Sequence, residues 1–254
     1  MKILLVGNYR YDGSTSMQIW ARALERDLLE MGIDARLISP RPVFGRFKPS
    51  PIGVGKWLGY IDRYLLFPRV LRTAAAKADV VHMCDHGSAM YCSAVNGTPV
   101  VVTCNDMLAV RGALGELPEM ASSRFGRYLQ LWICKGLKRA TQVACISQAT
   151  FDDAARILNR RDHLRVVLDA LNYPYQPLPA SETDRRLASL TAIKRPFLLH
   201  VGSNHARKNR DGILRAFAQV AARSELQLVF AGEGLNQNLL QLARQLGVED
   251  RIVQ

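Results

Sequence analysis

Short apolar runs alternate with longer segments of helical periodicity along almost the whole chain of 254 residues. Residues 3–6 and 35–39 form the first two runs, and between them apolar side chains recur every three or four positions up to Gly32. A strand, a helix and a second strand in this order need a crossover connection, which makes the two strands parallel. The sequence therefore predicts an α/β protein with doubly wound parallel sheets and helices on both faces.

Four more apolar runs follow in the first two thirds of the chain. They are predicted as strands at residues 79–83, 99–104, 142–146 and 164–168, with helices near Met90 and at residues 124–139 and 148–159. Six parallel strands are the size of one doubly wound domain. We predict that this domain covers residues 1–172.

Residues 173–196 contain four prolines and a segment of mixed charge, which is typical of an interdomain linker. The second domain, residues 197–254, has the pattern strand, helix, strand, helix, strand. The predicted elements are residues 197–201, 210–223, 226–231, 235–246 and 251–254. Three strands and two helices give a small core and leave a sheet edge bare. We expect this domain to be incomplete, in a fragment of a chain about half as long again.

The loop that opens the second domain joins an apolar strand to an amphipathic helix. Residues 197–201 suit a strand buried on both faces, and Asn209 is the predicted N-cap of the helix. Such a loop directs free backbone N–H groups and the positive end of the helix dipole toward a ligand. Because Arg207 and Lys208 add two cations, we predict a phosphate or diphosphate site; the alternative is that both are solvated surface charges.

The chain carries 34 Lys and Arg against 22 Asp and Glu, a net charge of +12, which favours anionic partners. Residues 41–77 hold eight of these cations and a single acid, Asp62, with six aromatic residues interleaved. This mixture is typical of a segment that binds an anionic membrane surface. Stacking on single-stranded nucleic acid and an ordinary solvated helix are the alternatives.

The five cysteines are scattered and form no C-x-x-C pair, which is typical of a reducing compartment and argues against a disulfide or zinc framework. The N-terminal apolar run is too short for a signal peptide. No run approaches the ~20 residues that span a bilayer. We predict a cytoplasmic protein that can lie on the inner face of the plasma membrane.

The loop after the first strand does not carry a dinucleotide fingerprint. It contains Gly7 and Gly13 but no G-x-G-x-x-G, and Ser39 and Pro40 stand where an acidic residue would bind a ribose. The absent fingerprint disfavours a nucleotide-dependent oxidoreductase of Rossmann type. A non-enzymatic basic nucleic-acid-binding module is a second alternative. No RRM, KH, zinc or helix-turn-helix signature supports the second.

Six segments of the chain resemble family 4 of the retaining GT-B glycosyltransferases, the "group 1" enzymes. They are DVVHMCDH (79–86), PVVVTCNDMLAVRGALGE (99–116), RATQVACISQAT (139–150), LNYPY (171–175), FLLHVGSNHARKN (197–209) and LVFAGEG (228–234). The resemblance implies two Rossmann-like domains and a metal-independent transfer that needs no cofactor. A sugar would move, with retention, from a nucleotide-diphosphate donor on the second domain to a lipid-linked or polysaccharide acceptor on the first.

The same resemblance assigns the site residues. Asn105 and Asp106 occupy the catalytic positions, and Gly7 and Gly13 belong to the acceptor-side loop. The donor would be bound by Gly202, Ser203, Arg207, Lys208, Glu233 and Gly234. No metal ligands and no nucleic-acid contacts are expected.

The chain departs from the family pattern at three places. Asn105 stands where the family commonly has histidine, and asparagine can bind a sugar hydroxyl but does not titrate near neutrality. Asp169 and Ala170 replace the usual Asn-Gly. The Glu-x7-Glu region that holds the donor sugar would lie beyond Gln254. We therefore expect no turnover from the chain as given.

Overall fold

The computed structural model describes residues 1–171, 175–194 and 196–254. It divides into two compact units, Met1–Pro174 and Tyr175–Gln254. Helix α7 (Ala180–Ala188) belongs to the second unit and lies within the range 173–196 that the sequence predicts as a linker. The middle of the LNYPY segment lies outside the described residues.

The first unit is built on a six-stranded parallel sheet with the order β2-β1-β3-β4-β5-β6. Its strands are β1 (Lys2–Val6), β2 (Asp34–Ile38), β3 (Val80–Met83), β4 (Val100–Cys104), β5 (Gln142–Cys145) and β6 (Leu164–Val166). All six strands are predicted from the sequence, and the α/β fold class is confirmed.

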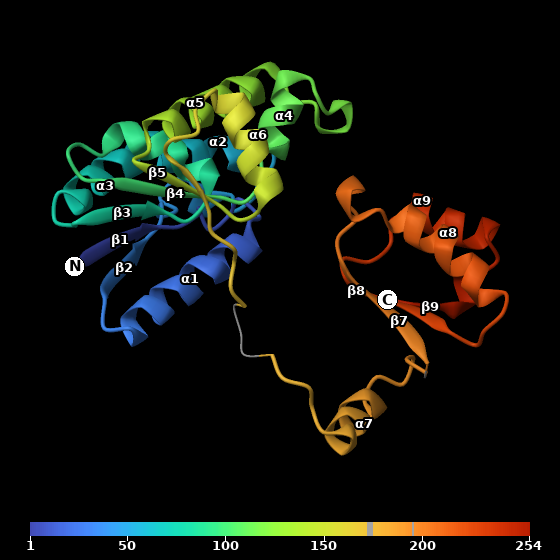
Figure 1. The fold of residues 1–254 in the computed structure, drawn as a ribbon. Coiled ribbons are helices and arrows are strands. Elements are labelled where there is room, and N and C mark those ends of the chain that lie inside the picture. The colour runs from blue at the N-terminus through green and yellow to red at the C-terminus, as the bar shows by residue number, and fades with distance from the viewer. Residues whose placement is uncertain (172–174, 195) are drawn as a thin grey trace. The chain divides into compact units, whose positions relative to one another are not determined.

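Helices cover both faces of this sheet, as Figure 1 shows. α1 (Thr15–Glu30) lies on one face, and α3 (Phe67–Ala75), α5 (Arg124–Arg139) and α6 (Gln148–Leu158) lie on the other. Side chains alternate between the faces of a strand, so Leu5 packs with α1 while Leu4 and Val6 enter the larger core on the opposite face. The other α-helices in the described part of this unit are α2 (Gly53–Ile61) and α4 (Leu108–Leu114).

The predicted helix near Met90 is a 3-10 helix, His86–Ala94, that packs closely against α5. Gly136 of α5 makes this approach possible, because a Cβ there would overlap the carbonyl group of Ala89. The sequence does not reveal this contact, which joins two elements that are far apart in the chain.

The basic segment is folded around its single acid. α2 continues through a π-helical turn, Asp62–Leu66, into α3. Asp62 is buried and accepts hydrogen bonds from the hydroxyl of Tyr9 (2.9 Å) and from the backbone N–H groups of residues 43, 44 and 45 (3.1, 2.9 and 2.9 Å). This one carboxylate therefore ties the loop before α2 and the loop after β1 to the helix.

The second unit has a three-stranded parallel sheet with the order β7-β8-β9. Its strands are β7 (Phe197–Gly202), β8 (Gln227–Gly232) and β9 (Ile252–Val253), and its sheet packs against α8 (Arg210–Ala221) and α9 (Gln237–Gln245). Leu214, Phe217 and Phe230 form the centre of its core.

The prediction that the strand at 197–201 is buried on both faces is wrong. β7 is an edge strand, and α8 and α9 cover only one face of the sheet, so Leu199 and Val201 are 58% and 67% exposed. The apolar run predicts a strand but cannot tell how many of its faces are covered.

None of the described helices is both long and apolar enough to cross a membrane. All five cysteines are free thiols, and all but Cys134 are buried.

Replacing Asp62 by Ala should lower the free energy of unfolding of the first unit by about 3 kcal/mol, because three backbone N–H groups and the Tyr9 hydroxyl lose a charged acceptor. All three tryptophans, Trp20, Trp57 and Trp132, lie in this unit, so urea denaturation followed by tryptophan fluorescence measures the effect. Asp34→Ala, at an exposed position at the start of β2, is the matched control and should change stability by less than about 0.5 kcal/mol. Equal effects of the two substitutions would contradict the role of Asp62.

Candidate active site

The strand order of the first sheet reverses between β1 and β3, and ligands of such sheets bind beyond the carboxyl ends of the strands at this point. The neighbouring ends of β1, β3 and β4 are followed by polar residues. These are Gly7 and Asn8 after β1, Asp85 and His86 after β3, and Asn105 and Asp106 after β4.

Asp85 accepts two hydrogen bonds and makes one ion-pair contact. Asn8 donates from Nδ2 to Oδ2 (2.6 Å), the N–H of Gly87 donates to Oδ1 (3.2 Å), and Nδ1 of His86 lies 3.1 Å from Oδ1. The side chains of Asp85 and His86 are each 13% exposed. The Oδ1 atom of Asn8 is buried without a hydrogen-bond partner among the described residues, so a further donor can be accommodated there.

The Asp85–His86 contact fixes the charges of both groups. Burial raises the pKa of Asp85, but the hydrogen bond and charge of His86 and the hydrogen bond from Asn8 outweigh it, so this pKa lies well below its usual range. Burial lowers the pKa of His86, but Asp85 and the charge of Asp106 outweigh it and raise the pKa above its ordinary value. Two carboxylates therefore favour the protonated form of the nearly buried His86.

The predicted catalytic residues lie next to this pair. Asn105 directs Nδ2 to the sulfur of Met17 (3.0 Å), and its carbonyl accepts a hydrogen bond from Thr150 (3.1 Å). Asp106 accepts the N–H of Leu108 (3.0 Å) at the start of α4. Asp85 and His86 were not among the residues assigned from the sequence, although they lie in the DVVHMCDH segment and, like Asn105 and Asp106, follow a buried strand.

The two glycines predicted for the acceptor-side loop, Gly7 and Gly13, have different structural roles. Gly7 lies beside Asn8, where a Cβ would come within 2.7 Å of the Ser39 hydroxyl oxygen. Gly13 adopts a φ of +79° in the turn before α1, with open space around it. Gly7 thus permits close packing of β1 against the end of β2, and Gly13 permits the turn.

The loop after β7 in the second unit is organised by Arg210, a residue not assigned from the sequence. Arg210 is 3% exposed, and its guanidinium donates to the carbonyl groups of Gly202 and Glu233 and to Oδ1 of Asn204, each at 2.7 Å. It also lies over the ring of Phe230, 5.0 Å from the centroid. Arg210 therefore joins the loops that follow β7 and β8.

The predicted donor residues Gly202, Glu233 and Gly234 meet at this junction. A carboxylate oxygen of Glu233 accepts the N–H of Asn204 (2.9 Å), and Nδ2 of Asn204 donates to the carbonyl of Gly234 (2.7 Å). The hydrogen bonds from Asn204 lower the pKa of Glu233. Glu233 is thus an ionised group that helps to shape the loop.

Arg207 and Lys208 form the end of a 3-10 turn, Ala206–Lys208, directly before α8. Arg207 is exposed, and the stem of Lys208 passes beside Gly202. Neither cation has an ion-pair partner among the described residues. Asn209 occupies the predicted N-cap position, with a φ of +47°, although its side chain makes no capping hydrogen bond. Ser203 lies half-buried in the same loop.

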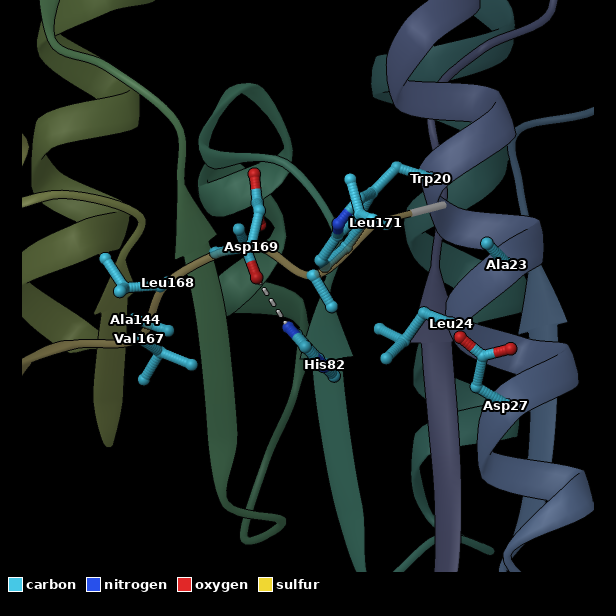
Figure 2. A pocket seen from close by; sticks show the side chains of 12 residues that line it. Trp20, Ala23, Leu24, Asp27, His82, Ala144, Val167, Leu168, Asp169 and Leu171 are labelled. Atoms are coloured by element: carbon cyan, nitrogen blue, oxygen red, sulfur yellow. Dashed lines mark hydrogen bonds between the residues drawn. The ribbon is translucent and has the colours of Figure 1, made fainter. Parts of the chain in front are cut away.

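A separate pocket of about 240 Å³ lies on the α1 side of the first sheet, as Figure 2 shows. His82 lies 2.8 Å from the hydroxyl of Thr103, and burial lowers the pKa of His82 to about 4. Burial also raises the pKa of Asp169, against a hydrogen bond from Trp20. Asp169 and Ala170, where the chain departs from the family pattern, line this pocket rather than the polar edge of the sheet.

The described residues contain no group of three or more His, Cys, Asp or Glu side chains that could hold a metal ion.

The model of Glycosyltransferase Family 4 matches residues 17–170. The chain belongs to this family. The match covers the Asp85 and Asn105 loops and ends before the loop that carries Arg207. Family membership argues against the oxidoreductase and nucleic-acid-binding alternatives. No curated protein sequence matches the chain.

Solved structures of the same fold cover both units. HepE from Anabaena, in complex with UDP and glucose, is 15% identical with a TM-score of 0.65, over 100% of this chain and 68% of that one. WaaG, a glycosyltransferase involved in lipopolysaccharide biosynthesis, is 17% identical with a TM-score of 0.65, over 99% and 69%. A UDP-GlcNAc 2-epimerase from Methanocaldococcus jannaschii is 13% identical with a TM-score of 0.56, over 100% and 73%. At these identities the similarity shows the fold, which is GT-B.

Arg210→Met should lower the stability of the second unit by about 3 kcal/mol, because three charge-assisted hydrogen bonds are lost and buried carbonyl groups remain without donors. Urea unfolding should show an earlier transition by circular dichroism, while tryptophan fluorescence, which reports only the first unit, should be unchanged. Arg215→Met, an exposed position on α8, serves as the control. An Arg210→Met variant as stable as the control would remove Arg210 from this role.

His86 should titrate above its ordinary pKa of ~6.5. Because the pKa is higher in the folded state, the contribution of His86 to stability is fully present below the unfolded-state pKa and is lost as the pH rises through the folded-state pKa. Proton NMR should therefore find His86 charged at pH values where free histidine is half neutral, and Asp85→Asn should shift its titration downward. A His86 titration that is the same in both proteins would contradict the coupling.

Proposed function

We propose that the protein transfers a sugar, with retention, from a nucleotide-diphosphate donor to a lipid-linked or polysaccharide acceptor. The observation that carries the proposal is the pair of cations Arg207 and Lys208, which have no ion-pair partner within residues 1–171, 175–194 and 196–254 and lie where a parallel strand leads into a helix. Membership of a glycosyltransferase family supplies the reaction class. The HepE structure in complex with UDP-glucose supports the donor class.

On the donor side, the leaving group of the reaction is a diphosphate. Lys208 and Arg207 would neutralise its charge, together with the backbone N–H groups at the start of α8. Gly202 would allow the backbone to approach the phosphates, while Ser203, Glu233 and Gly234 would line the nucleotide. In this proposal the two side chains and the helix terminus do the work that a metal ion does in other transferases, and no cofactor takes part.

On the acceptor side, the polar edge of the first sheet offers groups of two kinds. Asn105 and Asp106 would hydrogen-bond sugar hydroxyls. His86, kept charged by Asp85, would supply a donor and a positive charge beside Asp106. This charge takes the place of the histidine that the family commonly has at position 105.

An exposed aromatic ridge supports binding to the inner face of the plasma membrane through residues 41–77. Trp57 and Tyr60 of α2 contact Phe125 of α5 at ring distances of 5.2 and 5.5 Å, and Tyr64 contacts Trp132 at 5.6 Å. Trp57 is 57% exposed. Since cations surround these rings, the ridge has the composition that anionic headgroups and the membrane interface attract.

Lys208→Ala should weaken binding of UDP-glucose by about tenfold or more, because a charge-assisted contact to the diphosphate is lost. Isothermal titration calorimetry on the full chain measures this, with Arg215→Ala as the control that removes an exposed cation from α8 without touching the loop. Binding equal to wild type in Lys208→Ala would remove this lysine from the site. Failure of the wild-type chain to bind any UDP- or GDP-sugar would contradict the proposed donor.

A further inference from the structure

A second hollow of about 240 Å³ lies in the first unit, between the loop after β1 and α2. Tyr9, Tyr11 and Asp12 of the loop form one wall, and Lys56, Tyr60 and Arg63 form the other. None of the residues assigned to the sugar-transfer site lines it. Tyr9, which lines the hollow, directly follows Asn8 of the polar edge in the chain.

The walls of this hollow are held rigidly. Tyr9 is buried, and its hydroxyl is fixed by Asp62. Gly59 lets the helix lie against the ring, since a Cβ at that position would come within 3.0 Å of Tyr9. Arg63 lies in the π-helical turn that follows α2, and it lines the hollow together with Lys56, seven residues earlier. π-helical turns inside helices are frequent at functional sites.

Two cations, Lys56 and Arg63, and one carboxylate, Asp12, line the hollow, so the charge of its described lining is positive. The guanidinium of Arg63 lies 5.4 Å from the ring centroid of Tyr64, and the ammonium group of Lys56 lies 5.7 Å from that of Tyr60. Within the described parts of the chain, neither cation has a carboxylate within ion-pair distance. Asp62, which follows α2 directly, is already occupied by backbone N–H groups.

Apolar side chains are exposed next to these cations. Ile52, Val54 and Trp57 are 74%, 58% and 57% exposed, and all three lie at or just before the first turns of α2. A ligand that fits both features has an anionic group of small size joined to an apolar chain. A free anion would use the cations but leave the apolar residues in water, which is the less favourable arrangement.

We propose that this hollow binds the phosphate group of a membrane lipid, with the phosphate at Arg63 and Lys56 and the acyl chains along Ile52, Val54 and Trp57. Because Tyr9 of the hollow directly follows Asn8, a lipid held there also presents its headgroup to the polar edge of the sheet. In this respect the inference rests on the proposed function and narrows the acceptor to a phosphate-bearing lipid.

Calorimetric titration of the full chain with dihexanoyl phosphatidic acid, below its micellar concentration, tests the site. Arg63→Gln should weaken binding about tenfold or more, because a charge-assisted contact is lost. Arg72→Gln, which removes an exposed cation from α3, should stay within about twofold of wild type. Equal loss in the two variants, or no binding by the wild-type chain, would overturn the proposal.

Inorganic phosphate distinguishes a lipid site from a site for a free anion. It should bind much more weakly than the lipid, and binding of similar strength would overturn the lipid assignment. Sedimentation with phosphatidylcholine vesicles, with and without phosphatidic acid, should show retention only with the acidic lipid and less retention for Arg63→Gln than for Arg72→Gln.

Lys56→Gln is a second variant of the same site, needed because Arg63→Gln could fail to fold. Lys56 is exposed, so its replacement does not disturb the core. It should also weaken lipid binding, by about threefold or more, and unchanged binding would contradict its place in the site. UDP-glucose binding is measured on the same proteins. Lipid binding without donor binding would contradict the proposed donor but not this lipid site. Donor binding without lipid binding would contradict this lipid site but not the proposed donor.

Discussion

Parallel pairing is the constraint on which both units depend. Because every strand runs the same way, every loop that follows a strand emerges at the same edge of its sheet. This brings Asn8, Asp85 and Asn105 together although almost a hundred residues separate the first from the last. In the second unit the same rule brings Gly202 beside Glu233, and the N–H of Glu233 donates to the carbonyl of Gly202 at 3.2 Å.

Three buried charged residues, Asp62, Asp85 and Arg210, hold the loops of the two units. Several of their hydrogen bonds are from or to the backbone, which is how a charge can be removed from water without a large penalty. Nε of Arg210 has no hydrogen-bond partner among the described residues. Each of the three has another charged residue close to it in the chain: Arg63 follows Asp62, His86 follows Asp85, and Lys208 precedes Arg210 by two positions. His86 is paired with Asp85, whereas Arg63 and Lys208 have no ion-pair partner in the described part of the chain.

Sequence patterns predict what depends on local periodicity and miss what depends on contacts between distant elements. The six strands of the first sheet and the bounds of α5 follow from apolar spacing alone. The 3-10 helix at His86–Ala94 depends on the missing side chain of Gly136, and the exposure of β7 depends on which helices cover it. For the same reason the sequence indicates a basic loop before α8 but does not separate buried Arg210 from its exposed neighbours, since all three are cations in one short run.

The chain has a surplus of twelve positive charges, and several of its acids are engaged inside the protein. Asp62, Asp85 and Glu233 accept internal hydrogen bonds that hold loops, and Glu116 is paired with Arg111 and Arg156. The carboxylates most central to the structure are therefore not free to neutralise the cations at the two edges. A protein built in this way presents uncompensated positive charge wherever its loops are open, so the ligands that can lower its free energy there are anions. A sugar-nucleotide diphosphate and a lipid phosphate satisfy that requirement by the same physical means, in two units whose cores are separate.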